Sequence, residues 1–372
     1  MKEQIKSNKQ KSMLDTTFLV EIQVLIRMAR EAVVKSIDYM HVHTCFEIGR
    51  RIVEQEQKGK KRAEYGKALI KELAIQLTKE FGNGFSKRNL EYMRKFYMTY
   101  QSRHKQIAQT VSAQSKKSRK AQTPSAQSPL PRQFTLSWSH YVFLLGLENQ
   151  EERDFYEIEA TEQNWSLREL KRQFDSSLYE RLALSRDKKG IKRLSKKGQI
   201  VERPEDLIKN PYVLEFLGID EKTRYSESDL ESAIIDKLEH FLLELGKGFL
   251  FEARQKRFTF DEDHFFIDLV FYNRLLRCYV LIDLKIGKLT HQDLGQMQMY
   301  VNYFDRYVKT RDETPTIGII LCRKKREAMV EITLPKDANI HAKEYRLYLP
   351  SKEELRRKLL DWTKEQEVDG EL

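Results

Sequence analysis

The sequence predicts a protein of mixed α + α/β class, in which a helical N-terminal region precedes an α/β core. Apolar residues recur at helical spacing across residues 17–100, which indicates amphipathic helices. Between residues 225 and 325 the pattern changes to a helix, three strand-like runs, a second helix and a further strand, which is typical of an α/β module. A polar stretch, residues 101–133, interrupts the helical part and has few large apolar side chains.

The chain is basic and long enough for two or three domains. It has 372 residues, a formal net charge of +11 and 33% charged residues. A positive excess favours a nucleic acid as partner, because lysine and arginine side chains placed against phosphates release condensed counterions. The alternative is that the charge serves only solubility, as in many other basic proteins.

The cysteines and the hydropathy pattern bear on the cellular compartment. Cys45, Cys278 and Cys322 are far apart and odd in number, which argues against a disulfide framework and favours a reducing compartment. No apolar run approaches the roughly twenty residues that span a bilayer, and the first residues lack an apolar signal segment. We therefore expect a cytoplasmic protein without a membrane partner.

Two helices are predicted on either side of a short glycine-containing turn. Within residues 65–81, large apolar residues recur every four positions, at Leu69, Leu73, Leu77 and Phe81. The segment Gly82-Asn-Gly84 tolerates the left-handed backbone that ends a helix. Ser86 is placed to cap a second helix over residues 87–100.

This pair of helices has the character of a helix-turn-helix motif, in which the second helix contacts DNA. The candidate nucleic-acid contacts on the second helix are Lys87, Arg88, Asn89, Arg94 and Lys95. The alternative is an ordinary helical hairpin with a solvated charged face, which is the commoner arrangement. The helical region would then bind a protein partner or none.

We assign residues 17–185 to one helical domain that contains the flexible insertion 101–133. The insertion is rich in Gln, Ser, Lys, Ala, Thr and Pro and cannot bury enough apolar surface to offset the entropy of ordering. Helices resume after it. Ser166 and Glu169 have the spacing of a capping box, which predicts that a helix begins between them.

Residues 186–224 are predicted to form a basic linker. Lysine and arginine outnumber acidic residues across its first half, so the segment can follow a phosphate backbone. Its candidate nucleic-acid contacts are Lys192 and Arg193. A solvated connector without a partner explains the same composition equally well.

Two acidic residues in the segment 225–350 stand where strands normally bury apolar side chains. Asp268 and Asp283 each interrupt an otherwise apolar run of a predicted strand. A buried carboxylate is costly unless it is paired or binds a metal. Side chains alternate along a strand, so Asp283 and Lys285 project to the same side, and Asp268 can join them if the strands pair.

These three residues together suit metal-dependent chemistry. Two carboxylates favour Mg²⁺, which prefers oxygen ligands, with Mn²⁺ as the second candidate. A bound cation can polarise a phosphodiester and activate a water, and Lys285 can orient that water or neutralise developing charge. Singly, Asp268 could face solvent, and Asp283 could form a plain ion pair with Lys285. We favour the metal site because the three residues coincide in one α/β module.

The same pattern resembles the PD-(D/E)XK nuclease superfamily, and within it the bacterial YhcG-type proteins. The resemblance rests on Leu230-Glu-Ser-Ala-Ile-Ile-Asp-Lys-Leu, Phe266-Ile-Asp-Leu-Val-Phe-Tyr, Val280-Leu-Ile-Asp-Leu-Lys-Ile-Gly and Gly295-Gln-Met-Gln-Met-Tyr. The N-terminal half matches in Phe81-Gly-Asn-Gly-Phe-Ser-Lys-Arg-Asn-Leu, Ser137-Trp-Ser-His-Tyr and Trp165-Ser-Leu-Arg-Glu-Leu. The likeness covers most of the chain outside the insertion and the termini.

The resemblance implies a restriction-endonuclease-like core and a magnesium-dependent endonuclease that hydrolyses phosphodiester bonds of DNA, in DNA processing or defence. Asp268 and Asp283 would be the metal ligands and Lys285 the catalytic lysine. The rival hypothesis is a non-catalytic nucleic-acid-binding or adaptor protein that retains the fold. An RNA target is a further alternative, and a nuclease that cuts both strands would be expected to form a homodimer.

The resemblance adds two further site residues, Glu231 and Gln296. Helix capping by Ser228 explains Glu231 nearly as well, and a plain surface position explains Gln296. The sequence departs from the family pattern twice: Ile267 replaces the usual proline, and Asp283 stands where YhcG-type sequences often have glutamate. A C-terminal helical tail over 351–372 completes the predicted organisation.

Overall fold

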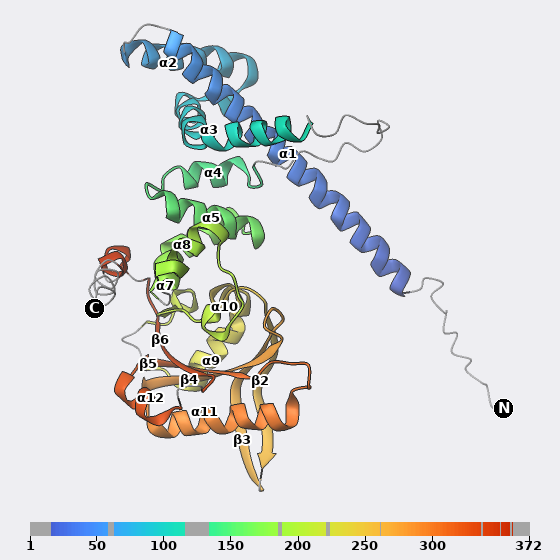
Figure 1. The fold of residues 1–372 in the computed structure, drawn as a ribbon, viewed down its shortest axis with the longest axis vertical. Helices are drawn as coiled ribbons and strands as arrows, with labels where there is room; N and C mark the ends of the chain where they lie inside the picture. The colour runs from blue at the N-terminus through green and yellow to red at the C-terminus, as the bar shows by residue number, and fades with distance from the viewer. Residues whose placement is uncertain are drawn as a thin grey trace, which may run out of the picture. The chain divides into compact units, whose positions relative to one another are not determined.

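The computed structural model describes residues 16–58, 63–115, 134–184, 188–220, 224–260, 262–335, 338–349, 351–357 and 359. The chain forms two compact units, Met1–Glu148 and Asn149–Leu372, which Figure 1 shows as a ribbon. The first is helical and the second combines helices with a six-stranded sheet, so the predicted α + α/β class is confirmed. Among the described residues, no helix has the length and apolarity needed to cross a membrane.

The helical unit contains four helices within its described residues: α1 (Thr16–Lys58), α2 (Ala63–Phe81), α3 (Lys87–Ser115) and α4 (Trp138–Leu144). The second half of α1 packs against α3. Gly49 permits this close approach, because a Cβ atom there would lie 2.0 Å from the main-chain oxygen of Met93. Aromatic rings complete the core, with Phe96 in contact with both Phe46 and Tyr141.

The predicted turn between α2 and α3 is confirmed. Helix α2 ends at Phe81, and Gly82 adopts a left-handed φ of 88° before the short 3-10 helix η1 (Asn83–Phe85). The hydroxyl of Ser86 accepts a hydrogen bond from the main-chain N–H of Asn89 at 3.3 Å, as expected of an N-cap.

Helix α3 continues to Ser115, so the prediction of a flexible insertion is wrong for residues 101–115. This part has no glycine or proline and consists largely of residues that tolerate a helix, so the helix propagates beyond the core. The rest of the insertion, residues 116–133, lies outside the described residues.

The second unit begins with helices α5 (Gln150–Glu162), α6 (Leu167–Asp175), α7 (Leu178–Ala183) and α8 (Lys188–Lys197). The capping box that begins α6 is confirmed. We expected these helices to belong to the N-terminal domain, with a boundary near residue 185. In the structure they fold within the second unit, where Arg181 of α7, for example, bonds Glu244 of the helix Leu238–Leu245 at 3.2 Å.

The segment predicted as a basic linker is folded wherever it is described. It contains α8, the 3-10 helices η2 (Pro204–Leu207) and η3 (Glu215–Leu217), and strand β1 (Tyr212–Val213). The main-chain N–H of Gln199 donates to the buried Glu159 carboxylate of α5 at 2.6 Å. The sequence gave no sign of this packing, because Ile191 and Leu194 are the large apolar residues of α8.

The sheet has the order β1-β6-β5-β4-β3-β2. Strands β2, β3 and β4 pair antiparallel, and β4, β5, β6 and β1 pair parallel. The other strands are β2 (Phe249–Phe260), β3 (Asp263–Asn273), β4 (Cys278–Lys288), β5 (Ile317–Lys324) and β6 (Ile340–Arg346). The predicted order of helix, three strands, helix and strand is confirmed, and β6 and β1 extend the sheet beyond it.

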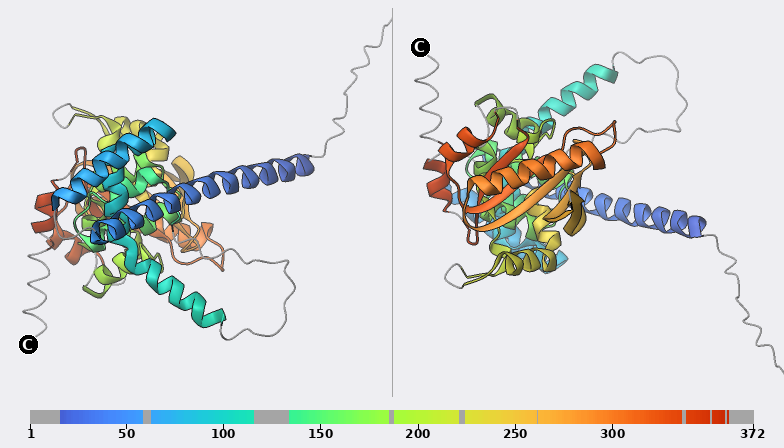
Figure 2. Two further views of the ribbon diagram at one scale, coloured as in Figure 1. Left: turned by 90° about the horizontal axis from the view of Figure 1, so that it is seen from above. Right: turned by 90° about the horizontal axis from the view of Figure 1, so that it is seen from below.

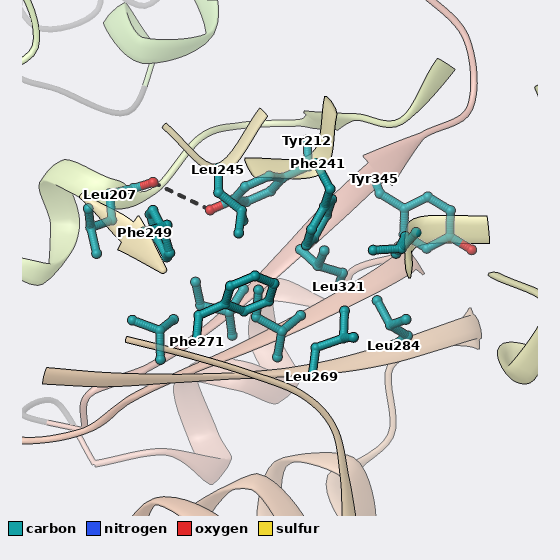
Figure 3. Packing of buried hydrophobic residues seen from close by; sticks show 14 of the residues in the cluster. Leu207, Tyr212, Phe241, Leu245, Phe249, Leu269, Phe271, Leu284, Leu321 and Tyr345 are labelled. Carbon is teal, nitrogen blue, oxygen red and sulfur yellow. Dashed lines mark hydrogen bonds between the residues drawn. The ribbon is translucent and has the colours of Figure 1, made fainter. Parts of the chain in front are cut away.

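Helices cover both faces of the sheet (Figures 1 and 2). On one face α9 (Glu227–Asp236) and α10 (Leu238–Leu245) pack over a core that includes Phe271, Leu284 and Leu321 (Figure 3). On the other face lie α11 (His291–Tyr303), extended by the π-helical turn η4 (Phe304–Val308), and α12 (Glu327–Thr333). Residues 352–357 of the predicted helical tail are helical, and residues 360–372 lie outside the described part.

Candidate active site

Asp268 lies where strands β3 and β4 separate. The antiparallel pairing of these strands ends at Leu269 and Ile282. Beyond that pair, the main-chain N–H of Leu284 has no main-chain acceptor on β3. It donates instead to the side-chain carboxylate of Asp268 at 2.8 Å. The neighbours of Asp268 alternate between the two cores, with Ile267 on the α11 side and Leu269 on the α9 side.

Asp283 and Lys285 project together from β4, as predicted. Ile282 and Leu284 point into the core under α9 and α10, so alternation turns Asp283 and Lys285 to the other side of the strand. The Asp283 carboxylate is 3% exposed, and its Oδ2 atom lies 2.9 Å from Lys285 Nζ.

The electrostatics of the pair are set by burial and by the second carboxylate. Burial raises the pKa of Asp283 well above its usual range, and the nearby charge of Asp268 raises it further. Burial would lower the pKa of Lys285, but the Asp283 carboxylate outweighs it and holds that pKa above the usual value. Lys285 is therefore a cation at neutral pH, beside two crowded carboxylates.

Glu231 is buried on α9 and belongs to the same cluster. It is 3% exposed, and it forms an ion pair with Arg254 of β2. The cap of α9 is Ser226, which forms a capping box with Asp229. The alternative in which Ser228 and Glu231 cap this helix is therefore wrong, and the Glu231 side chain is available to the cluster.

Gln255 of β2 joins Glu231 to Asp268, and the sequence gave no indication of it. Its Nε2 atom donates to Glu231 Oε2 at 2.5 Å and to Asp268 Oδ1 at 3.0 Å. The residue lies opposite Asp268 in the strand register, between the pairs formed by Arg254 and Lys256, and adopts a positive φ of 47°. A left-handed backbone conformation within a strand changes the direction of the side chain. At Gln255 it allows the side-chain amide to contact the carboxylates of Glu231 and Asp268.

Glu227, in the first turn of α9, supports Lys285 from a second direction. Its carboxylate lies 3.8 Å from Lys285 Nζ and accepts a hydrogen bond from the main-chain N–H of Ile286 at 3.3 Å. It thereby holds the end of β4 at the position of the lysine. No motif in the sequence marks this residue.

Gln296 reaches the site through Tyr300. The Gln296 amide bonds the Tyr300 hydroxyl, and that hydroxyl donates to the main-chain oxygen of Phe266 at 2.9 Å. Burial raises the pKa of Tyr300 to about 12, and the charge of Asp283 contributes to the shift. Gln296 therefore lies at the edge of the cluster, in contact with a tyrosine rather than with a carboxylate.

The residues present fit a divalent cation with oxygen ligands. Asp268 and Asp283 interact electrostatically within one buried site, and Mg²⁺ is commonly held by one or two carboxylates while it keeps several waters. Among the described residues, no group of three or more His, Cys, Asp or Glu side chains is arranged as a ready-made metal site. The donor set for such a cation would be the pair of aspartates, with Glu231 held beside it by Gln255.

The candidate DNA contacts on α3 fall into two classes. Lys87 and Arg88 are exposed on the first turn, where Lys87 is 3.8 Å from Glu91. The other three are engaged within the helical unit. Asn89 accepts a hydrogen bond from Trp138 at 2.9 Å, Arg94 pairs with Glu56 at 2.7 Å, and Lys95 bonds the Leu145 carbonyl at 2.6 Å.

The two candidate contacts on α8 are less informative. Arg193 is half-exposed and lies 3.5 Å from Glu202. The side chain of Lys192 lies outside the described residues, although α8 spans its position.

Comparison with known proteins identifies the family. A family model described as YhcG PDDEXK nuclease domain matches residues 205–360, and one described as DUF1016 N-terminal domain matches residues 21–181. A protein of Escherichia coli (strain K12), described as "Putative nuclease YhcG", is 41% identical over 340 residues, which is 89% of this chain and 90% of that protein.

Two solved structures share part of the fold at low similarity. A repair endonuclease from Pyrococcus abyssi matches at a TM-score of 0.24 and 16% identity, over 35% of this chain and 50% of that chain. The EndoMS–dsDNA2 complex matches at a TM-score of 0.24 and 14% identity, over 36% and 51%. The chain thus spans about half of each solved protein. By its family models and its E. coli relative, the chain belongs to the YhcG family, with a PDDEXK nuclease domain in its C-terminal part.

Proposed function

We propose that this protein is a magnesium-dependent endonuclease that hydrolyses phosphodiester bonds of DNA. The observation that carries the proposal is the crowding of Asp268 and Asp283 beside Lys285 in one buried cluster. Two carboxylates and one lysine leave an excess of negative charge, which a divalent cation would neutralise. Membership of a PDDEXK nuclease family supports the same activity.

Asp268 and Asp283 would hold the metal. When bound, Mg²⁺ supplies electrostatic stabilisation of the phosphodiester and a more acidic attacking water. The charged Lys285 orients that water and balances the negative charge that develops on the phosphate oxygens. Glu231 and Gln255 keep Asp268 in position, and Gln296 with Tyr300 fixes the main chain at Phe266.

DNA is the favoured substrate because the chain carries a net charge of +11, which attracts polyanions. Lys87 and Arg88 remain the strongest candidate contacts in the helix-turn-helix region, since their side chains are exposed. We also infer a homodimer, because two copies supply one site for each strand of a duplex. A cytoplasmic location follows from three cysteines that are free and buried.

A cleavage assay with matched variants tests the proposal. The purified protein is incubated with linear, supercoiled, branched and single-stranded DNA and with structured RNA, with Mg²⁺, with Mn²⁺, or with a chelator. Asp283→Ala and Lys285→Ala are compared with Lys288→Ala, which removes an exposed lysine from the same strand. We expect DNA cleavage that requires the metal and is lost in the first two variants only.

Other outcomes lead to other functions. Binding of DNA without cleavage by any of the proteins would favour the non-catalytic adaptor. Cleavage confined to RNA would change the substrate, and equal cleavage by all variants would place the catalytic site elsewhere.

A further inference from the structure

Residues 19–35 of α1 have no packing partner among the described residues. Every side chain from Leu19 to Lys35 is exposed, and the first buried residue of the helix is Val42. In Figure 2 this part of α1 extends away from the other helices of its own unit. A helix in water without tertiary contacts gains little from propensity alone, so this segment needs a partner to be stable.

The exposed segment is apolar on almost every side. Its eleven large apolar side chains are each 41–66% exposed: Leu19, Val20, Ile22, Val24, Leu25, Ile26, Met28, Val33, Val34, Ile37 and Met40. Monomeric proteins rarely expose contiguous apolar patches beyond about 300–600 Å². An apolar surface of this extent marks an interface.

A heptad pattern runs along the segment. Residues spaced alternately by three and four positions form one seam: Leu19, Ile22, Ile26, Ala29, Val33, Ser36 and Met40. This seam carries no charged residue. One heptad position holds Leu19, Ile26, Val33 and Met40, and the other holds Ile22, Ala29 and Ser36. Three heptads of this kind are typical of a helix that pairs with another helix.

We propose that residues 19–40 of α1 pair with the same segment of a second copy of this chain. The segment has three acidic residues (Glu21, Glu31 and Asp38) and three basic ones (Arg27, Arg30 and Lys35). It is therefore neutral in a chain of net charge +11, so it neither attracts a polyanion nor repels its own copy. A neutral apolar seam matches another neutral apolar seam.

The length of the segment is sufficient for a specific interface. A helix of 22 residues is about 33 Å long, and two such helices packed along one side bury on the order of 1,000 Å² in total, which is the area that specific interfaces require. The self-association does not depend on the proposed nuclease activity. If the chain does cleave DNA, pairing through α1 would bring two catalytic domains into one particle.

The mass of the full-length protein in solution tests the proposal. Ile26→Glu with Val33→Glu places charges in the seam, at side chains that are 45% and 59% exposed. Val20→Glu with Val34→Glu places the same charges outside the seam, at side chains that are 48% and 58% exposed. All four positions are solvent-facing in one chain, so the fold of the helical unit is unaffected, which circular dichroism verifies.

We expect sedimentation at micromolar concentration to give twice the 44.3 kDa of one chain for the wild type and the outer variant. The seam variant should sediment as a monomer. A monomeric wild type, as expected if α1 folds onto its own chain or awaits a different protein, overturns the proposal. Equal dissociation of both variants also overturns it. Sedimentation reports mass and not cleavage, so the test of self-association is valid even if the protein has no nuclease activity.

Discussion

The second unit contains two groups of charged side chains around buried carboxylates, one with an excess of cations and one with an excess of carboxylates. In the first group, Glu244 pairs with Arg181 and Arg172, and its main-chain oxygen accepts a hydrogen bond from Lys209. Burial alone would raise the pKa of Glu244, but the charges of Arg181 and Lys209 outweigh it and lower the pKa to about 2.

The second group has the opposite balance. Three carboxylates, Glu231, Asp268 and Asp283, lie beside two cations, Arg254 and Lys285. Here burial and carboxylate crowding raise the pKa of Asp283.

We propose that the difference separates a group that holds the fold from one that can bind a cation. A buried carboxylate saturated with cations and main-chain donors loses stability when any partner is removed. A buried carboxylate left short of positive charge lowers the stability of the protein until a cation arrives. The same amino-acid types therefore serve structure in one group and chemistry in the other.

The largest effect is expected from Glu244→Gln, which leaves Arg181 buried without its anion. We expect the free energy of unfolding to fall by about 3–5 kcal/mol, as measured by denaturant titration. Glu239→Gln is the matched control, since this side chain on the same helix is 86% exposed. An equal loss in both variants would show that the Glu244 group does not hold the fold.

Asp283→Asn should have the reverse profile. The rate of DNA cleavage should fall by about 10²–10³-fold, the usual effect of removing one preorganised electrostatic group. The free energy of unfolding should stay equal or rise, because the substitution removes a crowded buried charge. Cleavage kinetics and denaturant titration on the same samples check both, and a large loss of stability would place Asp283 with the structural group.

Gln255→Ala tests the link between the carboxylates. Without the amide, Glu231 and Asp268 lose their common donor, and we expect cleavage to slow by about 10-fold, as for groups that orient a metal ligand. Glu252→Ala, earlier on the same strand, serves as control. Rescue at higher Mg²⁺ concentration would show that Gln255 acts through the metal ligand, and unchanged kinetics would remove it from the site.

The smallest effect concerns His341 of β6, a partly buried base outside both groups. Burial lowers its pKa from 6.5 to about 4, and the nearby Lys343 contributes. The unfolded chain therefore binds the extra proton first, so stability is complete above pH 6.5 and falls as the pH drops towards 4. His341→Gln should reduce that loss by about 1 kcal/mol, measured as the difference between the two unfolding curves across this window.

The three residues singled out on two strands could be found from sequence because their signal is local. An aspartate within an apolar run and a lysine two positions later need only strand alternation to be interpreted. Their meeting required one further condition, the pairing of β3 with β4, which the sequence left open and the structure shows.

Gln255 could not be found in the same way. Its role depends on the cross-strand register with Asp268 and on a left-handed backbone at a residue other than glycine, and neither leaves a mark in the local sequence. The cap of α9 was ambiguous for a related reason. Ser226 and Ser228 are both followed three positions later by an acidic residue, and only the packing of Glu231 against β2 decides between them.

The sequence pattern also did not indicate which segments belong to the second unit. Strand β1 has two residues and pairs with β6, far along the chain. Two residues are too few to show the alternation that predicts a strand. The helices before it contact the segment around α10 through polar side chains, as in the bonds of Arg181 to Glu244 and of Lys247 to Glu159. Hydrophobic periodicity detects helices and strands, but it does not report which polar side chain meets which.

The bond between Leu284 and Asp268 gives this site a spectroscopic reporter of its own. Within a regular ladder, an amide proton of β4 would face a backbone carbonyl, whose charge is constant. The Leu284 proton instead faces a carboxylate oxygen, so its chemical shift and its rate of exchange with solvent follow the charge on that carboxylate. One resonance in a nuclear magnetic resonance titration can therefore follow cation binding directly, in wild-type protein and without any substrate.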